Sequence, residues 1–107
     1  MTQKKLILTT EIKRMSNLLD AHYDRELNFR NHCYLRIAYD AVVQDKWDLK
    51  ISKPFVKHAT DVQLQMAVVL LNNYLSDKQM LLADNDKSLF FRQQFKKQMQ
   101  VCDGKLF

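Results

Sequence analysis

Residues 33–43 form the most continuously apolar stretch of the chain. Nine of these eleven residues are apolar or aromatic, and the two exceptions, Arg36 and Asp40, are four positions apart. On a helix, that spacing places both charged side chains on one narrow face, while the remaining circumference needs cover from other elements. The pattern predicts a central helix that ends near residue 44 or 45, with the flanking segments packed over it.

The central helix carries one polar stripe, which we define as His32, Arg36 and Asp40. A buried charged pair is costly unless it is hydrogen-bonded, so burial of this stripe would mark conformational specificity or a site. The favoured interpretation is that the stripe faces solvent or the edge of a groove.

The segment before the central helix has a helical period. Ile12, Met15, Leu19 and Tyr23 recur at spacings of three and four, which predicts an amphipathic helix that starts near Thr9 or Thr10. We expect a break near residues 27–30, because one rod over residues 10–44 would be about 50 Å long. A single long helix remains the alternative if the chain dimerises.

Residues 45–59 are the least helical part of the chain. Trp47, Leu49 and Ile51 alternate with polar residues, and Pro54 disfavours helix at the residue before it. A lone strand would have no pairing partner, so we expect an extended, partly packed excursion.

Two capping boxes follow this excursion. Thr60 and Gln63 predict the start of a third helix, and Ser76 and Gln79 predict the start of a fourth after a tight reversal. The polar residues 83–87 could interrupt the fourth helix, and Gly104 is expected to cap its end. The fold class is therefore all-α: a compact four-helix domain of two helical pairs joined by the 45–59 excursion, with residues 1–107 as a single domain.

Composition excludes several functional classes. The chain of 107 residues has one glycine, Gly104, so it lacks a P-loop, a dinucleotide-binding loop and a nucleophile elbow. This argues against nucleotide-dependent enzymes and hydrolases, and we expect a non-enzymatic protein without a cofactor. The three histidines and Cys33 are not spaced as zinc ligands, so no metal is expected. Cys33 and Cys102 are expected to be reduced, buried thiols.

The apolar runs have consequences for the cellular location. None approaches the roughly 18–20 residues of a membrane span, and the run at residues 6–8 is too short for a signal peptide. We expect a cytoplasmic protein with no membrane partner.

Positive charge is concentrated in two segments. The net charge is +5, with +3 in residues 46–58, +3 in residues 89–107 and −2 in residues 59–88. Lysines interleaved with aromatic residues suit phosphate contacts and base stacking, so the first hypothesis is contact with a nucleic acid or an acidic protein. The alternative is a solvated loop whose Trp47 and Phe55 fill the core. The candidate contact residues are Lys46, Trp47, Lys50, Lys53, Lys57, Arg92, Lys96 and Lys97.

A second hypothesis is a protein-interaction or oligomerisation module, with a protein partner or a homo-oligomer. Phe90 points about 180° away from Leu81, outside the apolar face of the fourth helix, so we expect it to be exposed. Five scattered methionines would suit adaptable packing at such a surface.

A third hypothesis comes from Arg25 and His32, which are separated by six residues. An arginine followed at this distance by a histidine, in a small all-helical domain, resembles the motif of HEPN-type ribonucleases. The resemblance implies metal-independent cleavage of RNA by this pair, usually across a dimer. Glu26 departs from the family pattern, which usually has Asn, Asp or His after the arginine. The structural alternative is that Arg25 pairs with a neighbouring acid, Asp24 or Glu26.

Overall fold

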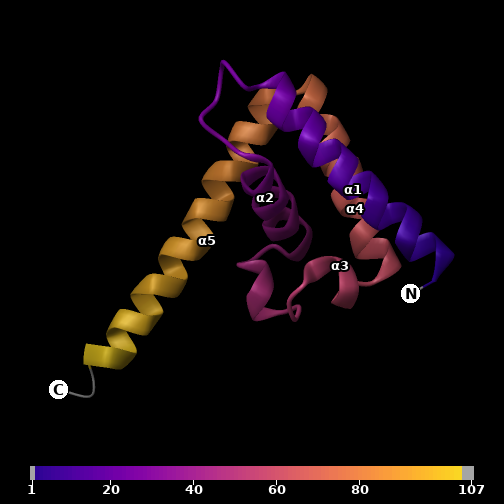
Figure 1. The fold of residues 1–107 in the computed structure, drawn as a ribbon. Helices are drawn as coiled ribbons and strands as arrows, with labels where there is room; N and C mark the ends of the chain where they lie inside the picture. The colour runs from indigo at the N-terminus through magenta and orange to yellow at the C-terminus, as the bar shows by residue number, and fades with distance from the viewer. Residues whose placement is uncertain (1, 105–107) are drawn as a thin grey trace.

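The computed structural model describes residues 2–104, with side chains described for residues 2–98. It is an all-α globule, and its described residues include no strand (Figure 1). The elements in chain order are α1 (Gln3–His22), α2 (Asn31–Val43), the 3-10 helix η1 (Trp47–Leu49), α3 (Phe55–His58), α4 (Asp61–Ser76) and α5 (Lys78–Gly104). The predicted fold class, with four main helices, is confirmed.

The first helix begins earlier than the sequence pattern predicted. Thr2 is the N-cap, and its hydroxyl accepts a hydrogen bond from the Lys5 amide at 3.2 Å. The hydroxyls of Thr9 and Thr10 instead donate to the carbonyls one helical turn earlier, so the predicted start near these residues is wrong. In the first turns the apolar residues Leu6, Ile7 and Leu8 are consecutive, which is not a helical period, and Leu6 and Ile7 are exposed. The chain leaves the helix between residues 23 and 30, which confirms two helices instead of one rod.

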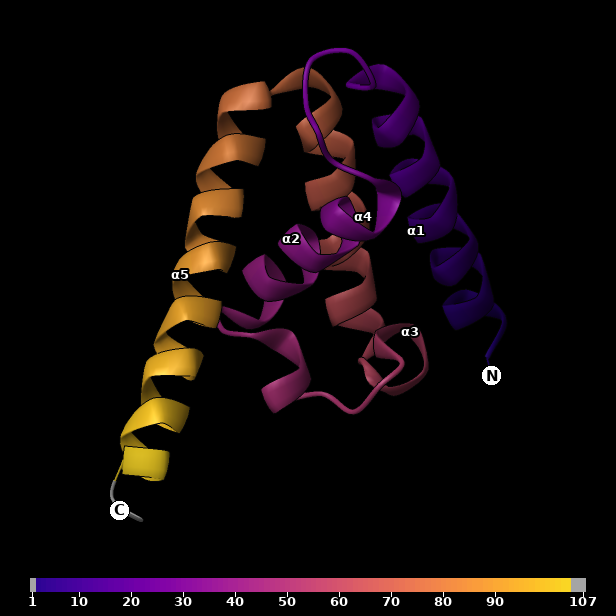
Figure 2. The same ribbon diagram turned by 60° about the vertical axis from the view of Figure 1, so that its left-hand side comes forward.

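The central helix α2 lies between the other three long helices (Figures 1 and 2). Tyr34, Ile37 and Ala38 are fully buried, as the apolar pattern predicted. The most extensive contact in the described part joins α1 to α4, whereas α2 packs on α5, α1 and α4 to similar extents. The two most extensive contacts, α1 with α4 and α2 with α5, therefore join helices on opposite sides of the 45–59 segment, and not the consecutive helices that the predicted pairs on either side of that segment would join. Helix α2 ends where Gln44 adopts a left-handed conformation with φ of 60°.

The 45–59 segment is compact, so the prediction of an extended excursion is wrong. The amides of Lys50 and Ile51 both donate to the carbonyl of Trp47, at 3.1 and 3.0 Å, and a further helical turn, α3, follows the cis Lys53–Pro54 bond. Aromatic packing holds this segment on α2: the Phe55 ring stacks on Tyr39 with centroids 3.8 Å apart, and Trp47 meets both rings edge-on. The alternation of apolar and polar residues at positions 47–51 therefore belongs to a helical turn packed on α2, and not to a strand.

The predicted capping box at the start of α4 is confirmed. The Thr60 amide donates to the Gln63 side chain, and the Gln63 amide donates to the Thr60 hydroxyl. The second predicted box is displaced by one residue. Ser76 is the last residue of α4, and Asp77 accepts the hydrogen bond from the Met80 amide at the start of α5. Helix α5 continues without a break through residues 83–87. The Cys102 thiol lies outside the described side chains, and Gly104 is the last residue of α5 and the last that the structure describes, so its role as a cap stays a prediction.

The hydroxyls of two stacked core tyrosines, Tyr23 and Tyr34, differ in hydrogen bonding, so we expect their removal to have opposite effects on stability. The hydroxyl of Tyr34 is buried without a hydrogen-bond partner among the described residues, and burial raises its pKa to about 12. The hydroxyl of Tyr23 donates to the Tyr74 carbonyl at 2.6 Å. We expect Tyr34→Phe to raise the free energy of unfolding by about 1 kcal/mol and Tyr23→Phe to lower it by about 1 kcal/mol. Urea denaturation checks both values, and a loss of stability in Tyr34→Phe would contradict the assignment of an unpaired hydroxyl.

Candidate binding surfaces

Asp40 is the centre of a polar network that joins α2 to α5. It is fully buried, and its carboxylate accepts hydrogen bonds from the Ser88 hydroxyl at 2.5 Å and the Trp47 amide at 2.9 Å. Two nitrogens of Arg92 donate to the same carboxylate at 3.1 and 3.2 Å. A buried carboxylate is tolerated when opposite charge and several donors surround it, and this arrangement supplies both.

Arg36 extends the network along the same face. Its guanidinium donates to the Ser88 hydroxyl at 2.6 Å and to the Asn85 side-chain oxygen at 3.0 Å. Helix α5 therefore covers the charged part of the polar stripe. The interpretation that the stripe faces solvent or the edge of a groove is wrong for Asp40, which is fully buried, whereas Arg36 is half-buried. His32 at the other end of the stripe is exposed. Sequence spacing placed the three residues on one face, but only the packing of α5 decided which of them are covered.

The network positions Arg92 at the edge of a hollow, which we call the basic cleft. Its volume is about 650 Å³, and it is lined by Lys46, Leu89, Arg92, Gln93, Phe95 and Lys96. The Lys46 ammonium lies 4.9 Å from the centre of the Phe95 ring and also bonds to Asp48. The cleft thus brings together Lys46, Arg92 and Lys96 from the two basic segments of the sequence.

The remaining candidate contact residues do not line this cleft. Lys50, Lys53, Lys57 and Lys97 are exposed, and Lys53 lies 3.4 Å from Asp48. Burial alone would raise the pKa of Asp48, but the hydrogen bonds and charges of Lys46 and Lys53 outweigh burial and lower that pKa. Trp47 is half-buried against Tyr39 and Phe55, and Phe55 is only 2% exposed. The aromatic residues of this segment therefore pack in the core, which was the alternative interpretation.

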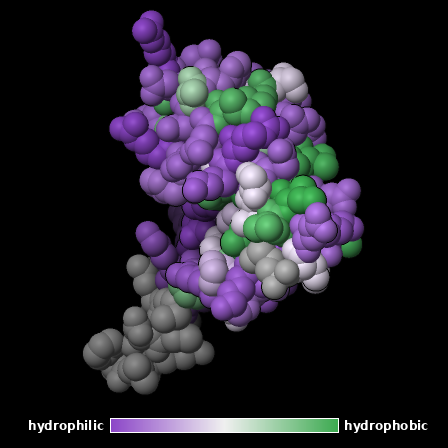
Figure 3. Space-filling view, turned by 45° about the vertical axis from the view of Figure 1, so that its right-hand side comes forward, coloured by the Kyte–Doolittle hydropathy of each residue, from purple (hydrophilic) through white to green (hydrophobic). Residues whose placement is uncertain are grey.

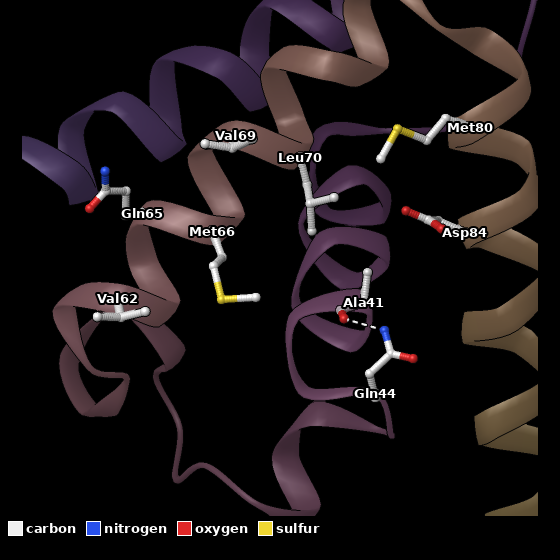
Figure 4. Close-up of a pocket in the computed structure, with 9 residues that line it drawn as sticks. All are labelled: Ala41, Gln44, Val62, Gln65, Met66, Val69, Leu70, Met80 and Asp84. Atoms are coloured by element: carbon white, nitrogen blue, oxygen red, sulfur yellow. Dashed lines mark hydrogen bonds between the residues drawn. The ribbon is translucent and has the colours of Figure 1, made fainter.

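A second hollow, which we call the apolar groove, lies where α4 meets the end of α2 and the beginning of α5 (Figure 4). Its volume is about 520 Å³, and its lining residues are Ala41, Gln44, Val62, Gln65, Met66, Val69, Leu70, Met80 and Asp84. The Asp84 carboxylate accepts a hydrogen bond from the buried Tyr74 hydroxyl at 2.5 Å. Burial, and then this carboxylate, raises the pKa of Tyr74 above its usual value.

The apolar groove was not predicted from the sequence, although the sequence contains a signal for it. Val62, Met66 and Val69 follow one another at helical spacing, but α4 is apolar on much of its circumference. Leu64, Ala67 and Leu71 on its other side are fully buried in the core, so the sequence alone does not distinguish the exposed apolar positions of α4 from its core positions.

The other predicted surface residues are placed as follows. Phe90 is 54% exposed, which confirms that it points away from the core. Arg25 and His32 are both exposed, in the turn after α1 and in the first turn of α2, and no hydrogen bond joins them in the described part of the chain. Within residues 2–104, whose side chains are described as far as residue 98, no group of three His, Cys, Asp or Glu side chains could hold a metal ion. No helix in the same range has the length and apolarity to cross a bilayer.

Fold and surfaces together define an all-α domain with a basic cleft and an apolar groove on different helix junctions. No protein-family model, curated protein or solved structure matches this chain.

Proposed function

We propose that the chain is a non-enzymatic helical binding protein that uses the basic cleft to contact the phosphates of a nucleic acid. The observation that carries the proposal is the convergence on one hollow of Lys46 with Arg92 and Lys96, which lie about 50 residues further along the chain. Lysine and arginine side chains gathered in this way bind phosphates through charge and release of counterions.

The charge balance around the cleft supports an anionic partner. Asp40 and Asp48 offset two positive charges, while the cleft and the adjoining network contain four, from Lys46, Arg92, Lys96 and Arg36. The difference, four minus two, is a net charge of +2 at this one position. Arg92 is also held by a buried carboxylate, so its orientation is fixed before a partner binds.

An acidic protein is the second candidate partner for the same cleft. Leu89 lines the cleft and is 51% exposed, and the next residue, Phe90, is 54% exposed. Apolar surface beside cations suits a protein partner, because phosphate contacts alone do not require it. The exposed lysines Lys50, Lys53, Lys57 and Lys97 could add charge to either complex.

Removal of one cleft charge gives the test. We expect Lys96→Gln to weaken binding of a fluorescent single-stranded oligonucleotide and to reduce the slope of log K against log salt by about 0.7. Lys96 is exposed at the cleft, so its replacement leaves the fold intact. Lys13→Gln is the matched control, because Lys13 is also exposed, on α1, and does not line the cleft.

The measurement is fluorescence anisotropy across a salt series, with a duplex and an oligo-glutamate peptide as further probes. Negligible affinity for both nucleic acids at low salt would refute the nucleic-acid proposal. Binding of oligo-glutamate alone, weakened by Lys96→Gln, would establish the acidic-protein alternative. Equal effects of Lys96→Gln and Lys13→Gln would show that only net charge matters and that the cleft is not the site.

A further inference from the structure

The outer face of α4 presents an apolar stripe with no partner among the described residues. Val62, Met66 and Val69 are 67%, 45% and 51% exposed and follow at i, i+4 and i+7, so they lie along one side of the helix. The space-filling view shows that exposed apolar surface forms patches among hydrophilic side chains (Figure 3). Apolar residues at this spacing are typical of the helix faces that pack against another helix.

The stripe borders a groove rather than a flat surface. Met66 and Leu70 extend from α4 toward α2, while Met80 and Asp84 lie across from them on α5 (Figure 4). The volume of about 520 Å³ is in the range of pockets that hold several side chains of a bound molecule. Two of the lining residues are methionines, whose flexible side chains adapt to different apolar surfaces. This geometry suits the binding of an amphipathic helix in a groove.

The charge around the groove favours a basic segment of another protein over a second copy of this chain as the bound partner. Asp84 is the charged residue of its lining, and Asp61 and Asp77 lie at the two ends of α4. Residues 59–88, which include α4 and the first part of α5, have a net charge of −2 in a chain of net charge +5. Two copies packed through this same face would bring their acidic segments together, which is unfavourable. A basic segment of another protein is complementary to it.

We infer that the apolar groove binds an amphipathic helical segment of a partner protein, with apolar side chains against Val62, Met66 and Val69 and with Lys or Arg beside Asp84. This site is separate from the basic cleft: none of its lining residues is shared with that cleft. It therefore stands whether or not the chain binds nucleic acid.

The experiment uses the full chain and a designed helical peptide of about four turns as the probe. The peptide has leucines at i, i+4, i+7 and i+11 and lysines on its flanks. A second peptide has glutamates in place of the lysines, and a third has the first composition in scrambled order. We expect the first peptide to bind at least tenfold more tightly than either of the other two, measured by anisotropy.

Paired variants locate the binding site. Met66→Ser/Val69→Ser removes the apolar stripe from exposed positions and is expected to weaken binding of the lysine peptide at least tenfold. Leu6→Ser/Ile7→Ser is the matched control on α1, at positions that are also about half exposed, and should change the affinity less than twofold. Asp84→Asn keeps an acceptor for the Tyr74 hydroxyl and should reduce the preference for lysine over glutamate peptides. Circular dichroism verifies that each variant is folded.

Three results would overturn the inference. The first is equal affinity for the lysine, glutamate and scrambled peptides. The second is equal weakening by the α4 and α1 double variants. The third is a dimer of the chain, detected by light scattering, that the α4 double variant dissociates, because the occupant would then be a second copy.

Discussion

Replacement of Asp40 by alanine is expected to lower the free energy of unfolding by about 3–5 kcal/mol, because it breaks a buried charge pair by removing one partner. The Asp40 carboxylate is fully buried and accepts four hydrogen bonds, from Ser88, Trp47 and two nitrogens of Arg92. The variant leaves these donors without their acceptor. The Trp47 amide belongs to η1, so the loss should also loosen the attachment of η1 to the end of α2.

Urea denaturation monitored by circular dichroism measures this effect. Asp86→Ala is the control, because Asp86 is exposed on α5 and should change the free energy of unfolding by no more than about 0.5 kcal/mol. The double variant Asp40→Ala/Arg92→Met should be less destabilised than the sum of its single variants, since it removes both charges of the pair. A loss below about 1 kcal/mol for Asp40→Ala would show that the network contributes little to stability.

Phe55→Ala is expected to lower the free energy of unfolding by about 3–5 kcal/mol, as for other large-to-small changes in a core. The Phe55 ring is 2% exposed and stacks on Tyr39 at an interplanar angle of 9°, with Trp47 edge-on at 5.5 Å. Burial raises the pKa of the Tyr39 phenol to about 12, which is consistent with a neutral ring in this cluster at pH 7. The variant would leave a cavity between α2 and the 45–59 segment.

Leu49→Ala in the same segment provides the comparison. Leu49 is 49% exposed, so its truncation should cost much less than that of Phe55. The quenching of Trp47 fluorescence by acrylamide gives a second readout, because loss of the Phe55 ring should open the indole to solvent. A small loss of stability in Phe55→Ala, with Trp47 unchanged, would mean that the segment is not an integral part of the core.

The local sequence determined several features because the interactions that produce them are local. The near-continuous apolar surface of residues 33–43 required a covered helix, and α2 is that helix. The side chains of Thr60 and Gln63 satisfy backbone groups within one turn, so their capping box was readable directly. The choice between Ser76 and Asp77 as a cap was not, because both residues can accept the same class of hydrogen bond.

Other features of the site depend on contacts between distant segments. Asp40 and Ser88 are 48 residues apart, and Arg36 and Asn85 are 49 apart. No local sequence pattern could therefore predict that α5 covers the polar stripe. The basic cleft also depends on contacts between distant segments. The sequence showed two basic segments, but only the packing of α5 beside Lys46 brought Arg92 and Lys96 to the same cleft. Lys50, Lys53 and Lys57 do not line it.

The sequence by itself thus determined that the chain is helical, where α4 begins, and that residues 33–43 lie at the centre. Helical periodicity and capping depend on residues within a few turns, which is why they could be predicted. The tertiary structure alone decided that Asp40 is buried among donors, that the 45–59 segment folds onto α2, and that the outer stripe of α4 stays open. Each of these depends on which helix packs against which, and that is set by the burial of apolar surface over the whole chain.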